Sequence, residues 1–294
     1  MGITLKQAQI ITAMVTPFTS DDRVDPESLQ TLLEYLLDHG TQGILINGTT
    51  GEGPNLTNEE KMFMVKHTLA LVNKRVPVIV GAGSNSTKAS IENVQELAAF
   101  SGIAALLVVV PYYNKPDQAG MIAHFTAVAD ASKFPIIIYN IPGRTGVKME
   151  VETVLKLAEH PNIVGIKNCT GANDLSLLIE NSPADFLVYS GEDEDALVVK
   201  TIGGAGIISV ASHLLGEQIA QMYDKVDAGE IKDAGQIMRR LTPKIAALFS
   251  LPSPAPVKAL LNLRGILVGQ PRLPILPANT VQQQTLVKIV EQKY

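Results

Sequence analysis

A lysine at the end of an apolar run is a candidate catalytic residue of this sequence. Residues 163–166 read Ile-Val-Gly-Ile and predict a buried strand, and Lys167 follows them directly. A buried lysine must be paired or neutralised, because its ammonium loses hydration. A neutral lysine amine can attack a carbonyl carbon and form an imine, which then acts as an electron sink. From this run alone, Lys167 either forms an imine in a pocket or extends its stem into solvent at the strand end.

Tyrosine and threonine hydroxyls lie where they could move the protons that imine formation requires. Tyr139 ends the predicted strand just before the one that carries Lys167, so neighbouring strands would bring the two side chains together. A hydroxyl such as that of Thr49 could link tyrosines to water in a proton relay. Tyr139 could equally be a packing residue of the interior, and Tyr112 and Tyr113 could belong to an interface, where tyrosine is enriched.

Two segments could hold carboxylates. Residues 48–52 read Gly-Thr-Thr-Gly-Glu and follow a predicted strand. Their open backbone N–H groups and threonine hydroxyls could bind an anion, although the same segment could be only a tight loop before a helix. Arg144 lies in a glycine-containing loop, and its planar guanidinium suits a carboxylate. A surface arginine is the simpler interpretation of Arg144 from the residues alone.

The other ionisable residues do not predict a metal or a nucleotide site. Residues 191–196 read Gly-Glu-Asp-Glu-Asp-Ala, and we interpret these acids as helix caps rather than metal ligands, because the helix dipole favours them there. The five histidines are scattered without paired spacing. Residues 81–86 lack the third glycine of a dinucleotide fingerprint. We therefore expect no metal and no cofactor.

Composition limits the class of protein. The chain has 294 residues, is 46% hydrophobic and 18% charged, and carries a net charge of -5. This mild acidity argues against a nucleic-acid partner, which would need a basic stripe. No apolar run approaches the roughly 18–20 residues of a membrane span, and the first residues lack the layout of a signal peptide. Cys169 is the only cysteine, so no disulfide can form within the chain. We expect a cytoplasmic protein without nucleic-acid or membrane partners.

Eight apolar runs alternate with amphipathic segments along the first three quarters of the chain. The predicted strands are residues 10–16, 43–47, 76–81, 105–110, 135–140, 163–167, 186–191 and 206–210. Runs without polar alternation are typical of parallel strands that are covered on both faces. We predict an α/β fold, a (β/α)8 TIM barrel over residues 1–225, with a C-terminal helical extension over residues 226–294 that packs on the barrel. A doubly wound sheet is the alternative, but no division into two nucleotide-binding halves is visible.

Seven motifs in this order resemble the pyruvate-dependent class I aldolase family of dihydrodipicolinate synthase and N-acetylneuraminate lyase. They are GTTGE (48–52), PYYNKP (111–116), YNIPGRTG (139–146), IVGIKNCTG (163–171), YSGED (189–193), GGAGIISV (203–210) and PSPAPVK (252–258). The resemblance implies that Lys167 forms an imine with pyruvate and that Tyr139 is the general acid and base beside it. It also implies that Thr49 bridges two tyrosines of a proton relay, and that Tyr113 reaches into the site of a neighbouring subunit.

The resemblance further implies a substrate pocket and a reaction. Thr49 and Thr50 would hold the pyruvate carboxylate, and Gly191 and the backbone carbonyl of Ile208 would line the pocket. Arg144 favours the synthase branch, in which it would bind the carboxylate of L-aspartate 4-semialdehyde, giving 4-hydroxy-tetrahydrodipicolinate on the way to diaminopimelate and lysine. The alternatives are a related lyase or dehydratase acting on a sugar-derived 2-oxo acid, and a non-catalytic barrel.

The resemblance also implies a homotetramer, built as a dimer of dimers, and we expect the same here. Lysine-inhibited members carry two histidines and an acid where this chain has Asn58, Lys61 and Ala89. We therefore predict weak or absent feedback inhibition by lysine. Asn168 stands where many synthases have glutamate, and we expect its side chain to point away from the imine.

Overall fold

The computed structural model describes residues 2–292, and its eight strands form one closed parallel barrel. The strands are β1 (Ile10–Ala13), β2 (Gly43–Ile46), β3 (Val78–Gly81), β4 (Ile103–Val109), β5 (Ile136–Asn140), β6 (Ile163–Asn168), β7 (Leu187–Ser190) and β8 (Gly206–Ser209). Each strand pairs with the next one in the sequence, and β8 closes the barrel against β1. The predicted (β/α)8 barrel is confirmed.

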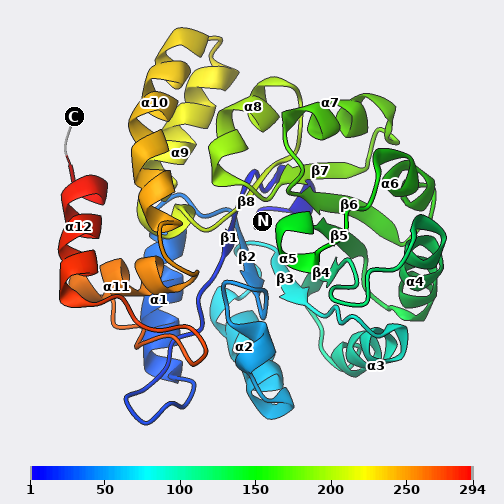
Figure 1. Ribbon diagram of the computed structural model, residues 1–294, viewed down its shortest axis with the longest axis horizontal. Coiled ribbons are helices and arrows are strands. Elements are labelled where there is room, and N and C mark those ends of the chain that lie inside the picture. Colours follow the sequence, from blue (N-terminus) through cyan, green and yellow to red (C-terminus); the bar gives the residue numbers. More distant parts are fainter. Residues whose placement is uncertain (1, 293–294) are drawn as a thin grey trace.

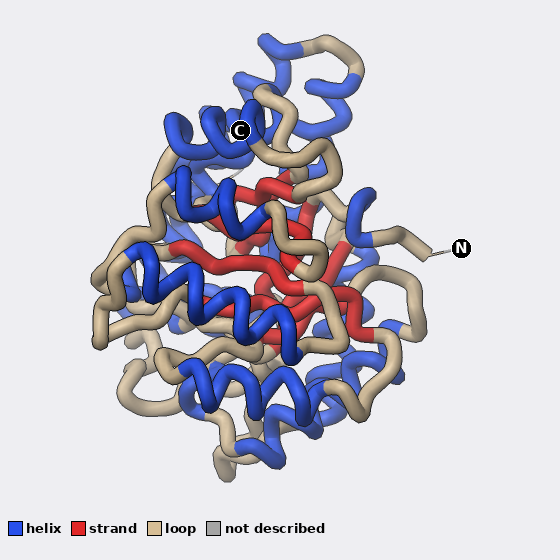
Figure 2. Tube along the Cα trace, turned by 90° about the vertical axis from the view of Figure 1, so that its right-hand side faces the viewer, coloured by secondary structure: helices blue, strands red, loops and turns tan. Residues whose placement is uncertain are grey.

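Helices cover the outside of the barrel, so both faces of each strand are buried (Figure 2). In β5, Ile136 and Ile138 pack in the outer core against the helices, whereas Ile137 and Tyr139 pack in the barrel interior. This alternation follows from the pleat, which points successive side chains to opposite faces. Tyr139 therefore points into the barrel at the carboxyl end of its strand, the end at which barrel enzymes build their sites.

The helices are α1 (Pro26–Asp38), α2 (Asn58–Val72), α3 (Thr87–Leu97), α4 (Gln118–Ala131), α5 (Pro142–Thr145), α6 (Val151–Ala158), α7 (Ala172–Asn181), α8 (Ala196–Thr201), α9 (Ser212–Asp227), α10 (Ile231–Leu248), α11 (Ala255–Leu263) and α12 (Thr280–Val290). Side-chain caps mark the starts of α1, α2, α3, α4 and α12. Asp25 accepts the N–H groups of the first turn of α1, and Thr57 forms a reciprocal capping box with Glu60 at α2. Within residues 2–292, no helix is long and apolar enough to cross a membrane.

The last helices gather on one side of the barrel beside α1 (Figure 1). There α10 packs on α9, and α12 packs on α10 and α11. The predicted C-terminal helical extension is confirmed, and the predicted boundary at residues 225–226 falls within the last turn of α9. Helix α11 and the loop after it reach back to the mouth of the barrel, where they contact the segment that follows β2.

Candidate active site

Lys167 and Tyr139 are direct neighbours at the barrel mouth. They pair in register across β5 and β6, and the Lys167 Nζ lies 4.5 Å from the centroid of the Tyr139 ring. Both side chains are nearly buried, at 5% and 6% exposure. The sequence left open whether Lys167 extends into solvent. Because the side chain is buried, it does not. The lysine and the tyrosine are thus placed as imine formation and proton transfer require.

A glycine leaves the space that the Lys167 stem occupies. A Cβ added at Gly191 would lie 2.6 Å from the Lys167 Cε and 2.4 Å from the Cys169 Sγ, distances that real side chains do not tolerate. Gly191 follows β7, the next strand of the barrel, and its N–H donates to the Asn168 carbonyl at 2.9 Å. The predicted pocket residue Gly191 therefore contacts Lys167 directly. Burial raises the pKa of the Cys169 thiol to about 12, so the thiol is not a competing nucleophile at neutral pH.

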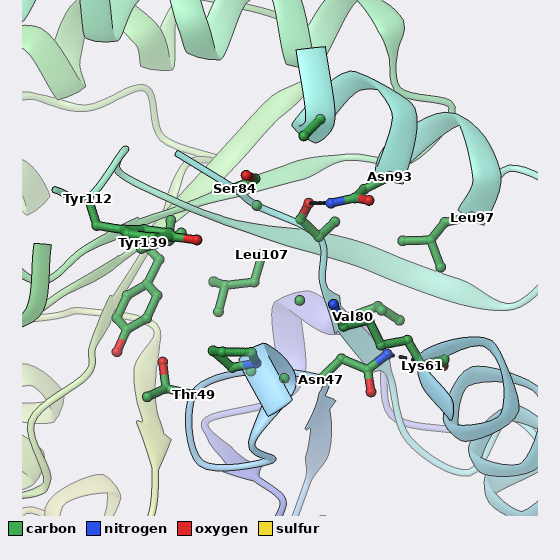
Figure 3. Close-up of a pocket in the computed structure, with 18 of the residues that line it drawn as sticks. Asn47, Thr49, Lys61, Val80, Ser84, Asn93, Leu97, Leu107, Tyr112 and Tyr139 are labelled. Atoms are coloured by element: carbon green, nitrogen blue, oxygen red, sulfur yellow. Dashed lines mark hydrogen bonds between the residues drawn. The ribbon is translucent and has the colours of Figure 1, made fainter. Parts of the chain in front are cut away.

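A cavity of about 470 Å³ is lined by Tyr139 of this pair, and Lys167 itself is not among its lining residues (Figure 3). Its lining includes Thr49, Tyr139 and Arg144, which come from three different loops or strands. In Figure 3 the Tyr139 hydroxyl points toward the Thr49 side chain. Arg144 lies on the short helix α5 and is exposed to solvent at the cavity. The cations Lys61 and Arg144 contribute to the lining and no carboxylate does, so the cavity favours an anionic ligand.

The segment after β2 is held rigidly by its backbone. Asn47 and Glu52 both adopt left-handed conformations, with φ of 56° and 55°, which non-glycine residues rarely adopt. The Thr16 hydroxyl donates to the Gly51 carbonyl at 2.6 Å, and a Cβ at Gly53 would lie 2.3 Å from the Asn47 carbonyl oxygen. These contacts restrict the conformation of the segment that carries the two threonines.

The remaining predicted residues divide into buried and exposed groups. Thr50 and Ile208 are buried, and Ile208 pairs with Ile11 of β1 inside the barrel. Tyr113, by contrast, is 87% exposed and has a φ of 74°. It lies on the surface of the chain and does not join Lys167 there.

The acids after β7 do not cap their own helix, so that interpretation was wrong. Asp193 turns into the core, where it accepts the Ser209 hydroxyl and the N–H groups of Val210 and Ala211, each N–H at 3.0 Å. Burial raises its pKa, and these donors oppose the shift. At the start of α8, Asp195 makes no capping bond in the described structure. Asp193 instead fixes the turn between β8 and α9.

Asn168 hydrogen-bonds away from the lysine. Its side chain accepts from the Asn140 amide at 3.1 Å and donates to the Thr170 hydroxyl at 2.6 Å. Because Lys167 and Asn168 are consecutive in β6, they point to opposite faces of the strand.

Sequence reasoning missed a charged cluster that holds Glu52, the last residue of the 48–52 segment. Glu52 forms an ion pair with Lys258, and the backbone N–H of Arg272 donates to the same carboxylate. The motif that contains Lys258 was visible as PSPAPVK, but its contact with a residue 206 positions earlier was not.

The far end of the cavity carries the three residues on which the feedback prediction depends. Asn58, Lys61 and Ala89 all line it, between α2 and α3. Asn58 and Ala89 are uncharged and Lys61 is a cation, so none of the three side chains is acidic.

Comparisons with known proteins agree over the whole chain. A model of the dihydrodipicolinate synthetase family matches residues 6–293. The 4-hydroxy-tetrahydrodipicolinate synthase of Ligilactobacillus salivarius (strain UCC118) is 52% identical over 283 residues, which cover 96% of this chain and 98% of the relative. The crystal structure of a dihydrodipicolinate synthase from Bacillus anthracis matches with a TM-score of 0.95 at 42% identity, over 98% of each chain. A monomeric dihydrodipicolinate synthase variant matches with a TM-score of 0.92 at 35% identity, over 97% of this chain and 96% of the other.

Proposed function

The chain belongs to the dihydrodipicolinate synthetase family, and from this premise we propose which of its residues carry out the reaction. It condenses pyruvate with L-aspartate 4-semialdehyde to 4-hydroxy-tetrahydrodipicolinate, and is therefore a lyase of diaminopimelate and lysine biosynthesis. The family resemblance seen in the sequence is confirmed. The sugar-acid lyase and the non-catalytic barrel are set aside, because relatives that match almost the whole chain carry the synthase name.

The observation that carries the residue assignment is the buried pair of Lys167 and Tyr139. The lysine amine lies over the tyrosine ring at the barrel mouth, beside a cavity that suits anions. The Lys167 amine attacks C2 of pyruvate, the carbinolamine loses water, and an iminium forms that withdraws electrons from C3. Loss of a proton from C3 gives an enamine whose C3 attacks the aldehyde carbon of the acceptor. The acceptor's amine then attacks C2, releases the lysine and closes the ring.

The Tyr139 hydroxyl moves the protons of these steps. It gives a proton to the carbinolamine oxygen that leaves as water, and Thr49 connects it to further hydroxyls. The orientation of the Tyr139 hydroxyl toward Thr49 in Figure 3 supports this assignment. No separate cofactor or metal is part of the proposal, because pyruvate bound as an imine on Lys167 supplies its own electron sink.

Two carboxylates need two binding sites. The rigid segment that carries Thr49 and Thr50 binds the pyruvate carboxylate with backbone N–H groups and hydroxyls. Gly191 and the Ile208 carbonyl line the inner wall around the imine. Arg144, exposed at the cavity, binds the carboxylate of the semialdehyde through its planar guanidinium.

Assembly completes the site in this proposal. The Tyr113 ring is 87% exposed on a left-handed backbone that Thr145 holds through a hydrogen bond from the Tyr113 N–H, at 3.2 Å. A strained, exposed aromatic residue suits a partner subunit. We therefore propose a homotetramer, a dimer of dimers in which Tyr113 enters the neighbouring site. A cytoplasmic location also belongs to the proposal, in keeping with a biosynthetic enzyme that has one cysteine.

Feedback by lysine is weak or absent in the same proposal. A lysine ligand carries an ammonium on its side chain, and the end of the cavity near Lys61 offers it a cation and no carboxylate. Clear inhibition of the purified enzyme by sub-millimolar lysine would overturn this part.

Borohydride trapping tests the central assignment. Wild type and Lys167→Ala are reduced in the presence of pyruvate, and the adduct is located by peptide mass spectrometry. We expect a pyruvate-sized adduct on Lys167 and none in the variant. A folded wild type that forms no adduct, or forms it on another lysine, would refute the mechanism.

A further inference from the structure

We propose, building on the function above, that the buried ion pair of Glu52 and Lys258 is a positioning device. It holds the Thr49–Thr50 segment in the conformation that binds the pyruvate carboxylate. The C-terminal region, which contributes Lys258, would then be part of the substrate-binding apparatus.

Both oxygens of the Glu52 carboxylate are bound by the C-terminal region. The Lys258 Nζ lies 2.8 Å from one oxygen, and the backbone N–H of Arg272 donates to the other at 2.8 Å. The Lys258 Nζ also donates to the Gln270 carbonyl at 3.2 Å. Both charged side chains are essentially buried, at 2% and 0% exposure. Helix α11 and the loop that follows it therefore hold one side chain of the barrel mouth from two directions.

Phe18 fixes the cations of this cluster. The Lys258 Nζ and the Arg272 guanidinium each lie 4.1 Å from the centroid of its ring. Arg272 also forms ion pairs with Glu60 at 2.6 Å and with Asp22 at 2.8 Å. Cations over an aromatic face are attracted by its quadrupole, more so when they are shielded from water. Lys258 consequently has little freedom to leave Glu52.

Glu52 transmits this constraint to the threonines. It is two residues from Thr50, and its N–H donates to the Thr49 carbonyl at 3.0 Å. Its backbone lies in the left-handed region, with φ 55° and ψ 31°, where a glutamate is strained. Strain of this kind persists only where the surroundings hold it, and it gathers at functional sites. The ion pair is the side-chain contact that holds Glu52 in this conformation.

Stability alone does not account for the pair. Replacing a buried ion pair by well-packed apolar residues is often neutral or stabilising, so such a pair is weak evidence for a stabilising role. Burial lowers the pKa of Lys258 to about 8 in spite of the neighbouring carboxylate. The protein thus keeps a cation where burial disfavours it, paired with a glutamate that is two residues from Thr50.

The test separates geometry from stability with matched variants. Lys258→Met removes the cation and leaves the Glu52 carboxylate unpaired, whereas Glu52→Gln with Lys258→Met removes both charges. Lys200→Met is the control: Lys200 is also largely buried, pairs with Asp227 at 2.6 Å and lies near the Tyr223 ring. Lys200 binds Gln9, which precedes β1, and so lies at the opposite end of the barrel. The readouts are Tm, kcat, and KM for each of the two substrates.

We expect the double variant to regain most of the Tm lost in Lys258→Met. Its KM for pyruvate should still rise at least about tenfold, since a displacement of about 1 Å at a site can cost up to about a hundredfold. The KM for the semialdehyde should stay close to wild type, because its proposed ligand Arg144 lies outside the cluster. Lys200→Met should change Tm without changing the KM for pyruvate.

A double variant with wild-type KM for pyruvate would overturn the positioning role, as would equal rises in both KM values. Wild type is trapped with borohydride alongside. If wild type forms no adduct on Lys167, the proposed mechanism fails; if it does and the double variant binds pyruvate normally, only the positioning role fails.

Discussion

Two buried lysines of this protein carry the same chemical group in opposite surroundings. Lys167 and Lys258 are 5% and 0% exposed, and each ammonium lies over an aromatic ring, that of Tyr139 or Phe18. Lys258 also contacts the Glu52 carboxylate at 2.8 Å. Among the described residues, the Lys167 ammonium forms neither a hydrogen bond nor an ion pair.

This difference separates an anchoring lysine from a reactive one. A carboxylate partner favours the charged ammonium and fixes its position, which suits a residue that holds a loop. A lysine without such an anchor suits an amine that must attack a carbonyl carbon. Burial is common to both residues, so the partner and the adjacent space decide the role.

The largest expected effect comes from removing the reactive lysine. Lys167→Ala should lower kcat by about a thousandfold or more, because the covalent route is lost. Lys167→Arg should lose as much, since a guanidinium keeps its proton in proteins. Steady-state rates check both, with circular dichroism as the control for folding. An arginine variant with substantial activity would break the distinction between the two lysines.

The next largest effect should come from removing the hydroxyl of Tyr139, whose ring lies under the Lys167 amine. Tyr139→Phe keeps the ring under Lys167 and removes only the proton donor, so kcat should fall by about 10²- to 10⁴-fold. Tyr112→Phe is the matched control, because Tyr112 lines the same cavity but has no place in the proposed relay. Similar rates for the two variants would remove Tyr139 from the mechanism. Single-turnover kinetics show which step is slowed.

The anchoring lysine should dominate stability instead. Lys258→Met strands the Glu52 carboxylate in the core, and breaking a buried pair in this way typically costs about 3–5 kcal/mol. Lys167→Met breaks no ion pair. The free energy of unfolding of this variant should therefore match or exceed that of wild type. Urea denaturation measures both values. Equal destabilisation by the two substitutions would contradict the comparison.

Acid should lower the stability of the folded protein through protonation of His213. This buried residue accepts the Val15 N–H through Nε2 at 3.1 Å and donates from Nδ1 to the Val210 carbonyl at 2.8 Å. Burial lowers its pKa from 6.5 to about 4. The unfolded chain then binds a proton first, so stability falls as pH drops from 6.5 toward 4, by roughly 3 kcal/mol in total.

Urea titrations at several pH values between 7 and 4 measure this loss. His213→Gln should reduce the pH dependence over that interval but not abolish it, because burial also lowers the pKa of His124 to about 4. An unchanged slope would show that His213 is not the group responsible.

The smallest effect concerns the space around the reactive lysine. Gly191→Ala places a methyl group 2.6 Å from the Lys167 Cε, so the stem must shift. Borohydride trapping should slow by roughly tenfold, because the amine no longer approaches the carbonyl correctly. Gly235→Ala is the control, since the nearest atom its Cβ would meet is the Arg239 Nη1, at 3.5 Å on the outer helix α10. Unaltered trapping in Gly191→Ala would show that the stem tolerates the shift.

Strand assignment from apolar runs succeeded in number and order, and less well in length. The first run was predicted to extend to residue 16, whereas β1 ends at Ala13. Met14 and Val15 are buried nonetheless, because apolar character reports burial rather than ladder pairing. The interpretation of the acids after β7 as helix caps failed for a similar reason. A pattern typical of a helix start does not show that the Asp193 side chain turns inward to Ser209.

The sequence by itself determined the barrel, the order of its strands and the residue types at its mouth. Continuous apolar runs can be satisfied only by burial on both faces, and strand ends place Tyr139 and Lys167 side by side once the strands pair in order. Only the tertiary structure decided which charges meet. Glu52 and Lys258 are far apart in the chain, and no periodicity links them, because ion pairing depends on distances that folding alone creates.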